Sequence, residues 1–310
     1  YTRNPYSPDR VTAGSSGGTA AAVAANFGLA GLGTDTGNSI RGPSSHQALV
    51  GIRSTMGLTS RAGVFPLNLL ADIAGPMTRT VEDAARLLQV IAGTDVDDPV
   101  TAAADGRLHA DYLSALDRDG LRGVRIGVLR QAYERETTDG EITAVFGVAL
   151  DDMRRSGAVI VDPATVEGLE DIRRPESGPG SRSDPCMGFK YDLNRFLRAR
   201  TDRVSVKSLA EVIASGGFHP HVQRRLETAE AGPENGPESA ACRVEQEYRD
   251  KVRKAVLATM DRLQLDAFAY PTWSNPPRLI GDLNTPHGDN SQFFSPTTGF
   301  PAVNVPMGYT

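Results

Sequence analysis

Residues 13–43 read AGSSGGTAAAVAANFGLAGLGTDTGNSIRGP, and the rest of the chain is organised around this stretch. It opens with a glycine-serine loop at Gly14–Gly18 and closes with a second polar loop at Gly33–Arg41. Between them, a run of small residues predicts a helix over Thr19–Phe27, and a short apolar run predicts a buried strand over Leu29–Leu32. Two serine-bearing loops therefore flank one helix, and we expect both to converge on one point in space.

The composition of the two loops favours nucleophilic chemistry. A serine hydroxyl is a weak nucleophile until a base accepts its proton. Glycines beside a serine leave successive backbone N–H groups accessible, and such groups form a concave anion site that stabilises a developing oxyanion. A single glycine-serine cluster is more typical of a turn or linker. Two of them, separated by one helix and one strand, shift the balance towards a catalytic site.

The two loops resemble the signature of the amidase signature family. The likeness continues through further stretches at 50–57, 74–85, 92–95 and 298–308, whereas residues 99–266 match only in outline. This resemblance implies an α/β fold with a mixed central β-sheet that is covered by helices on both faces. It also implies one domain over residues 1–310, which reads as a piece of a longer chain that is cut at both its N-terminal and C-terminal ends.

The resemblance further implies a Ser–Ser–Lys amidohydrolase. Ser39 would be the nucleophile, and Ser15, reached through a non-proline cis peptide after Gly14, would shuttle the proton between Ser39 and a lysine. The backbone N–H groups of Thr36, Gly37, Asn38 and Ser39 would form the oxyanion hole. The reaction would hydrolyse the C–N bond of a small or peptide-like carboxamide through an acyl-serine intermediate, releasing a carboxylate and ammonia or an amine.

The lysine of this triad has no counterpart in the sequence. In the family it lies several tens of residues before the glycine-serine loop, and only thirteen residues precede Gly14 here. All four lysines come late, at Lys190, Lys207, Lys251 and Lys254. Because the mechanism needs a neutral buried lysine as its base, we expect little or no turnover from these 310 residues alone.

Several residues near the nucleophile depart from the family pattern. Asn38 stands where the family usually has glycine, and asparagine tolerates left-handed backbone geometry better than most residues. His46-Gln47-Ala48 and Arg53-Ser54 also replace the usual residues, which bears on the substrate pocket more than on the reaction. Asp35 and Arg41 flank the loop, and we expect them to pair and brace it rather than contact substrate.

Two other functions stay open from the sequence. Gly14–Gly18 also fits the G-x-S-x-G elbow of an α/β-hydrolase, an esterase-type enzyme in which Ser16 would act with a later aspartate and His287. That interpretation leaves the second serine loop unexplained. Alternatively, the chain is a non-catalytic relative, or the amidase-type subunit of a transamidation complex, as the late lysines and the change at Asn38 allow.

The general composition predicts an ordinary globular protein. The chain carries a formal net charge of −5, which gives no support for binding nucleic acid, and no apolar run is long enough to span a membrane. No cofactor or metal is implied. His219-Pro-His221 suggests a metal site, but no cluster of Cys, Asp or Glu with ligand spacing accompanies it, so a surface loop is favoured. Cys186 and Cys242 lack CxxC spacing and fit a reducing, cytoplasmic compartment without a disulfide framework. A homodimer stays open from the sequence.

Further elements follow from hydrophobic patterns. Acidic residues after Thr80 predict the start of a helix. Val124–Leu129 and Ala158–Val161 are expected to be strands joined by a helix over Gly140–Ser156, whose inner face would carry Val145, Ala149 and Met153. A plain loop is expected over 173–184, and a helix that is a candidate wall of the substrate pocket over 184–203. The tail, 275–310, is expected to run irregularly over the active-site face.

Overall fold

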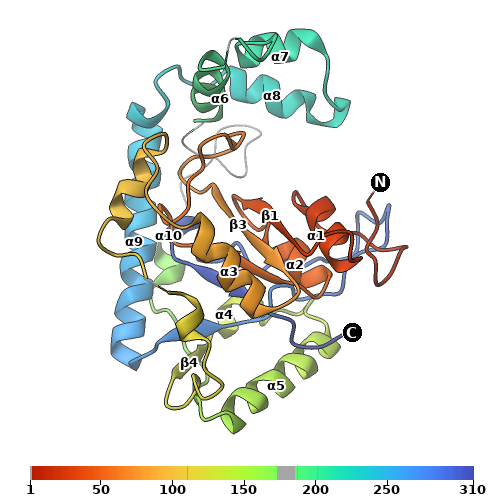
Figure 1. Cartoon of the computed structure of the whole chain (residues 1–310), viewed down its shortest axis with the longest axis vertical. Helices are drawn as coiled ribbons and strands as arrows, with labels where there is room; N and C mark the ends of the chain where they lie inside the picture. Colours follow the sequence, from red (N-terminus) through yellow and green to blue (C-terminus); the bar gives the residue numbers. More distant parts are fainter. Residues whose placement is uncertain (1, 110, 173–185, 187, 201) are drawn as a thin grey trace.

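The computed structural model describes the whole chain except residues 1, 110, 173–185, 187 and 201 (Figure 1). The loop expected over 173–184 therefore lies outside the described residues. The α-helices are α1 (Gly17–Ala24), α2 (Arg41–His46), α3 (Val81–Ile91), α4 (Arg130–Tyr133), α5 (Gly140–Arg155), α6 (Phe189–Arg198), α7 (Leu209–Ser215), α8 (Gln223–Glu230), α9 (Ala240–Leu263) and α10 (Ser295–Thr298). Short 3₁₀ helices lie at Pro99–Ala104, Leu113–Ala115, Leu169–Asp171, Pro220–Val222 and Gly236–Glu238.

Four strands form an antiparallel sheet in the order β1-β3-β2-β7. Their bounds are β1 (Ala30–Asp35), β2 (Val50–Arg53), β3 (Ile73–Thr78) and β7 (Ala302–Asn304). β1 and β7 come from opposite ends of the sequence, so this sheet brings the tail of the chain to its opening segment. The expectation of a wholly irregular tail is wrong in this respect, because β7 pairs with β2 there.

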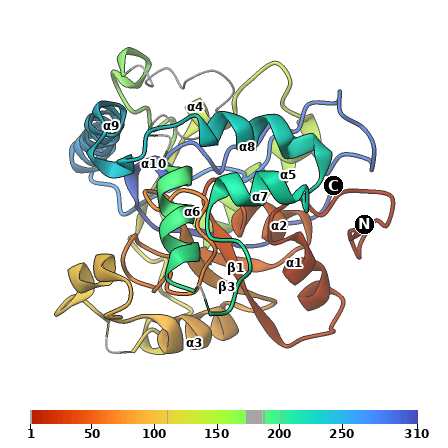
Figure 2. The same cartoon turned by 90° about the horizontal axis from the view of Figure 1, so that it is seen from above.

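Helices cover both faces of this sheet (Figures 1 and 2). Alternation along β2 explains how: Val50 and Ile52 pack with α3 on one side, while Gly51 faces Ser44 of α2 on the other. The side of α1 and α2 has its own core of Ala20, Val23, Ile40, Leu49 and Met77. As expected from the sequence, Thr80 caps α3, since its side chain accepts a hydrogen bond from the backbone N–H of Asp83.

Three parallel strands form the second sheet, in the order β5-β4-β6. They are β4 (Arg125–Val128), β5 (Val159–Val161) and β6 (Ala267–Ala269), and α5 joins β4 to β5 in the expected crossover. Val128 packs with Phe146 and Leu150 of α5, and the adjacent Leu129 packs with Val252 and Val256 of α9. The α/β class is thus confirmed, with helices on both faces of each sheet.

The inner face of α5 differs from the prediction by one position. Its buried residues are Ile142, Phe146 and Leu150. Of the expected residues, Met153 packs against the core of Val128, Phe146 and Leu150. Val145, Ala149 and Met153 also line a large cavity, together with Ile142 and Phe146. Both sets have the same helical spacing, so periodicity alone does not identify the set that packs against β4.

Helices α6, α7 and α8 form a separate layer beside the antiparallel sheet (Figure 1). They share an apolar core that includes Leu193, Leu197 and Leu209. A disulfide joins Cys186, which precedes α6, to Cys242 in the first turn of α9. The expectation of unpaired cysteines is therefore wrong. The two cysteines are 56 residues apart in sequence, and only the fold brings them together.

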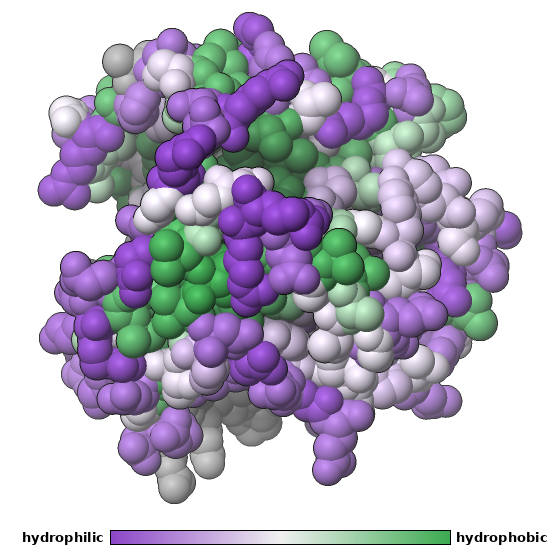
Figure 3. All heavy atoms as spheres, turned by 90° about the horizontal axis from the view of Figure 1, so that it is seen from below, coloured by the Kyte–Doolittle hydropathy of each residue, from purple (hydrophilic) through white to green (hydrophobic). Residues whose placement is uncertain are grey.

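The surface is unevenly apolar. Several large hydrophobic side chains are exposed, including Phe27, Val96 and Leu283. Figure 3 shows apolar residues gathered in the middle of one face, with hydrophilic residues around them. None of the helices in the described ranges has the length and apolar character that a membrane span needs.

Candidate active site

The structure joins the two serine-bearing loops, which we call the Ser15 loop (residues 13–16) and the Ser39 loop (residues 36–40). The backbone N–H of Ser16 donates a hydrogen bond of 3.3 Å to the carbonyl oxygen of Ser39. The Gly14–Ser15 peptide bond is cis, as the resemblance implies. Ser15 is exposed and Ser39 is partly buried. The hydroxyl groups of Ser15 and Ser39 are not hydrogen-bonded to each other among the described residues.

The side chain of Ser16 ties the Ser15 loop to β1. Its hydroxyl donates to the Thr34 carbonyl oxygen and accepts from the Thr34 N–H, both at 3.2 Å. His287, its proposed partner in an α/β-hydrolase, instead accepts a hydrogen bond from the Asp289 N–H and packs its ring near Trp273. In the described part of the chain no hydrogen bond joins Ser16 to His287, so the structure does not assemble that alternative site.

Asp35 is the last residue of β1 and is fully buried directly before the Ser39 loop, where it binds groups from both sides. One carboxylate oxygen accepts from Arg41 Nε at 3.1 Å and from the Ile40 N–H at 3.2 Å, and the other accepts from Arg53 at 3.1 Å. Burial alone would raise the pKa of Asp35, but the charges of Arg41 and Arg53 and these hydrogen bonds hold that pKa below its usual range. The predicted Asp35–Arg41 brace is confirmed, and Arg53 is an additional member.

Arg41 also orients the backbone of the Ser39 loop. It donates to the carbonyl oxygen of Gly37 at 2.7 Å and to the carbonyl oxygen of Ser291. The N–H groups of Gly37, Asn38 and Ser39 donate no hydrogen bond to any other described residue. Three successive donors in one loop thus stay available for an anion.

Thr36 is fixed by Asp72, which lies just before β3. The Thr36 hydroxyl donates to Asp72 at 2.5 Å, and the other Asp72 oxygen accepts from the N–H groups of Leu67 and Asn68. Burial raises the pKa of Asp72, against the effect of these hydrogen bonds. Asp72 thereby ties the start of the Ser39 loop to the neighbouring strand.

Asn38 is anchored by the tail of the chain. Its side-chain amide donates to Asp289 at 2.8 Å, and Asp289 also accepts from the Gln292 side chain at 2.6 Å and from the hydroxyl of Ser291 at 2.6 Å. Asn38 is not among the non-glycine residues with a left-handed backbone, so its replacement of glycine needs no such tolerance. The tail does cover this face, as the sequence predicts.

A large cavity of about 1060 Å³ lies beyond α2 and is lined by residues from both sheets. His46, at the end of α2, lines it and stacks on Trp273 with ring centroids 4.4 Å apart. Both ring nitrogens of His46 are buried without a hydrogen-bond partner in the described structure. Burial, with a smaller contribution from His287, lowers the pKa of His46 to about 3, so its ring is neutral.

The four lysines lie outside both serine-bearing loops. The ammonium of Lys190 in α6 pairs with Glu234 at 2.6 Å and Glu230 at 3.2 Å, and these carboxylates raise its pKa. Lys251 and Lys254 are exposed on α9. None of the lysines, all of which are described, hydrogen-bonds to Ser15 or Ser39.

Sequence reasoning missed three residues that shape this site. In the sequence Arg53 is only a departure from the family pattern, and no motif marks Asp72 or Asp289. Each acts from a distant part of the chain, and no local motif marks a carboxylate that will meet a loop 36 or 251 positions earlier.

Comparisons with known proteins agree with this geometry. The family model described as Amidase matches residues 1–310. One subunit of a glutamyl-tRNA(Gln) amidotransferase from Myxococcus xanthus is 36% identical over 318 aligned positions, which cover 100% of this chain and 63% of that protein.

Two solved structures show the same similarity. The native peptide amidase from Stenotrophomonas maltophilia superposes with a TM-score of 0.76 at 32% identity, covering 100% of this chain and 62% of that one. A bacterial aryl acylamidase of the amidase signature enzymes superposes with a TM-score of 0.73 at 25% identity, covering 99% of this chain and 61% of that one. The chain therefore spans a little over three fifths of the length of these relatives.

Proposed function

Because the chain belongs to the amidase family, we propose that it is the serine-bearing part of an enzyme that hydrolyses carboxamides through an acyl-Ser39 intermediate. The observation that supports this most directly is the junction of the two loops. The Ser16 N–H is bonded to the Ser39 carbonyl oxygen, and the N–H groups of Gly37, Asn38 and Ser39 have no hydrogen-bond partner among the described residues. The products would be a carboxylate and ammonia or an amine.

The proposed roles follow the chemistry of each group. Ser39 Oγ attacks the amide carbon, and its proton passes through Ser15 to the base and then to the leaving nitrogen. The N–H groups of Thr36, Gly37, Asn38 and Ser39 stabilise the negative charge that develops on the carbonyl oxygen. Water then cleaves the ester of Ser39 by the reverse sequence of proton transfers and releases the carboxylate.

We place the lysine base outside these 310 residues. A lysine that acts as a general base must be neutral near pH 7 before it can accept a proton. Burial away from carboxylates lowers the pKa of a lysine into that range. Lys190 has the opposite environment, because two carboxylates stabilise its charged form. We accordingly propose that these residues alone have little or no turnover.

A second candidate function is that of one component in a transamidation complex. The observation that favours it is the 36% identity, over the whole of this chain, to a protein described as an amidotransferase subunit. Size-exclusion chromatography with mass detection of the protein, purified from its own cells, distinguishes the cases. Stoichiometric foreign subunits support the complex, and a mass of one or two copies supports a free amidase or a homodimer.

A cytoplasmic location is part of the proposal, and the Cys186–Cys242 disulfide gives it a test. Disulfides are rare in a reducing cytoplasm. Rapid alkylation of intact cells followed by mass spectrometry reports whether the two cysteines are free in that compartment. A fully oxidised pair would place the protein elsewhere.

The proposed reaction is tested by variants of the protein expressed from its complete reading frame. Hydrolysis of a peptide amide is measured by ammonia release for Ser39→Ala, Ser15→Ala, Ser16→Ala and Ser205→Ala. We expect Ser39→Ala to lower kcat by roughly 10⁴-fold or more, and Ser15→Ala to lower it severely. Ser205, which is exposed, lines neither cavity and forms no side-chain hydrogen bond in the described structure, is the matched control and should be near normal. Near-normal rates in Ser39→Ala would refute the assigned nucleophile.

A further inference from the structure

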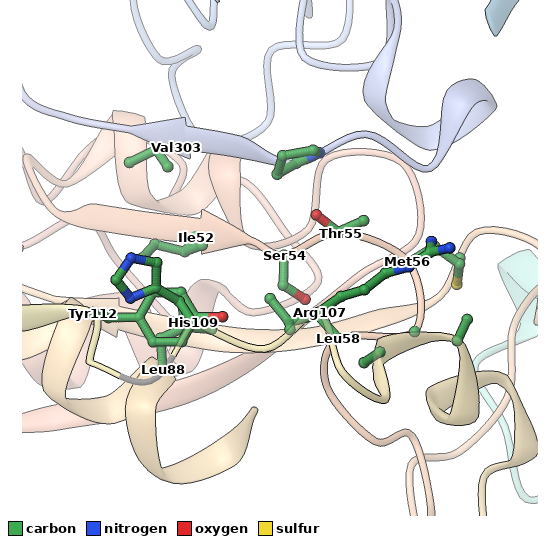
Figure 4. A pocket seen from close by; sticks show the side chains of 14 residues that line it. Ile52, Ser54, Thr55, Met56, Leu58, Leu88, Arg107, His109, Tyr112 and Val303 are labelled. Carbon is green, nitrogen blue, oxygen red and sulfur yellow. The ribbon is translucent and has the colours of Figure 1, made fainter. Parts of the chain in front are cut away.

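A second cavity lies on the other side of the antiparallel sheet from the Ser39 loop. Its volume is about 470 Å³, which is within the range of small-molecule sites. Alternation along β2 sets the two sides apart: Ile52 lines this cavity, while the next residue, Arg53, turns to Asp35 beneath the Ser39 loop. We call it the β2–α3 pocket (Figure 4).

The floor of the β2–α3 pocket is apolar. Ile52 and Val303 are directly opposite each other in the register of β2 and β7, so their side chains point to the same side. Leu88 of α3 and Leu58 complete the floor. Val303 is 59% exposed, although it faces this hollow. An apolar ligand body would remove that surface from water, which is favourable.

Two of the polar residues that line the pocket, Arg107 and His109, stand at opposite ends of it (Figure 4). Arg107 extends along one side towards Met56, and its guanidinium has no hydrogen bond or ion pair with any described residue. At the other end, the ring of His109 lies against Tyr112 with centroids 5.6 Å apart. The Nδ1 atom of His109 accepts from the Asp111 N–H, which leaves its other nitrogen as a donor.

We propose that the β2–α3 pocket binds a small monocarboxylate with an apolar, preferably aromatic, body. The carboxylate would pair with Arg107, whose planar fork of donors matches two carboxylate oxygens. The body would lie over Ile52 and Val303 and reach the His109–Tyr112 pair. The assignment concerns binding alone and does not depend on the proposed amide hydrolysis.

Isothermal titration calorimetry with 4-phenylbutanoate and with the neutral 4-phenylbutan-1-ol tests this proposal. The two probes share an apolar body and differ in the charged group. We expect the carboxylate to bind roughly tenfold more tightly than the alcohol, because hydrogen bonds to charged groups contribute more than neutral ones. Equal affinity, or no binding of the carboxylate, would overturn the proposal.

Two variants of the pocket and two control variants locate the binding site. Arg107→Gln should weaken carboxylate binding to about the level of the alcohol, and Val303→Phe, which fills the floor, should weaken both probes. Arg224→Gln on α8 is the matched control, since Arg224 is also exposed and does not line the pocket; it should change neither. Ser39→Ala should likewise leave both affinities unchanged. Carboxylate binding that survives Arg107→Gln but fails in Ser39→Ala would place the ligand at the candidate active site instead and refute the inference.

Discussion

The side-chain amide of Asn38 donates a hydrogen bond of 2.8 Å to Asp289, a residue 251 positions further along the chain. Through this contact the tail fixes the residue next to the proposed nucleophile. The same carboxylate accepts from Ser291 and Gln292, so its position does not depend on Asn38 alone. The Ser39 loop is therefore held from three directions, by Asp35, Asp72 and Asp289.

The first prediction concerns this anchor in the complete protein. Asp289→Ala should lower kcat roughly tenfold with little change in KM, because the loop N–H groups act mainly on the transition state. Asn38→Gly removes the donor, so adding Asp289→Ala to it should cause a much smaller further loss. Steady-state kinetics of the two single variants and the double variant form the cycle. Additive losses would show that the two residues act independently.

The buried Asp35–Arg53 pair should be costly to break. Arg53→Met leaves Asp35 with less compensation in a fully buried position, and we expect the free energy of unfolding in urea to fall by about 3–5 kcal/mol. The exposed pair Arg86–Glu82 is the control, and Arg86→Met should cost less than about 1 kcal/mol. Equal effects of the two substitutions would contradict the role given to Asp35.

The disulfide should stabilise the junction of the α6–α8 layer with α9. Cys186 and Cys242 are 56 residues apart, and a loop of that length corresponds to about 4 kcal/mol of chain entropy in the unfolded state. Dithiothreitol should therefore lower the Tm of the oxidised protein. The double variant Cys186→Ser/Cys242→Ser should already have the lower Tm and show no response to reductant. A wild-type Tm that reductant leaves unchanged, with reduction verified by mass, would count against this contribution.

Acid should destabilise the fold through His46. Its pKa is about 3 when folded and about 6.5 in an unfolded chain, so above pH 6.5 neither state binds the proton. Between these values only the unfolded state is protonated, and stability falls by about 1.4 kcal/mol per pH unit as the pH decreases. His46→Phe keeps a ring against Trp273 and removes the titration. The stability difference between wild type and variant should change with this slope from pH 6 to pH 4, and a constant difference would show that His46 is not buried neutral.

The sequence predicts the local parts of this site better than the distant ones. Asp35 and Arg41 are six positions apart within one polar loop, and their pairing is predictable because both flank the same turn. The junction of the Ser15 and Ser39 loops follows from one helix and one strand between them. The contributions of Asp72 and Asp289 depend instead on strand pairing and on the path of the tail, which no local pattern specifies. The same limit applies to α5, where two equally spaced apolar sets compete for the core.

The central claim is that Ser39 is the nucleophile. The most direct measurement treats the protein, expressed from its complete reading frame, with a fluorophosphonate and maps the modified peptide by mass spectrometry. We predict a label on Ser39 that is lost in Ser39→Ala and retained in Ser205→Ala. A label on Ser16, or no label on a protein whose circular dichroism and cooperative melting show that it is folded, would contradict the claim.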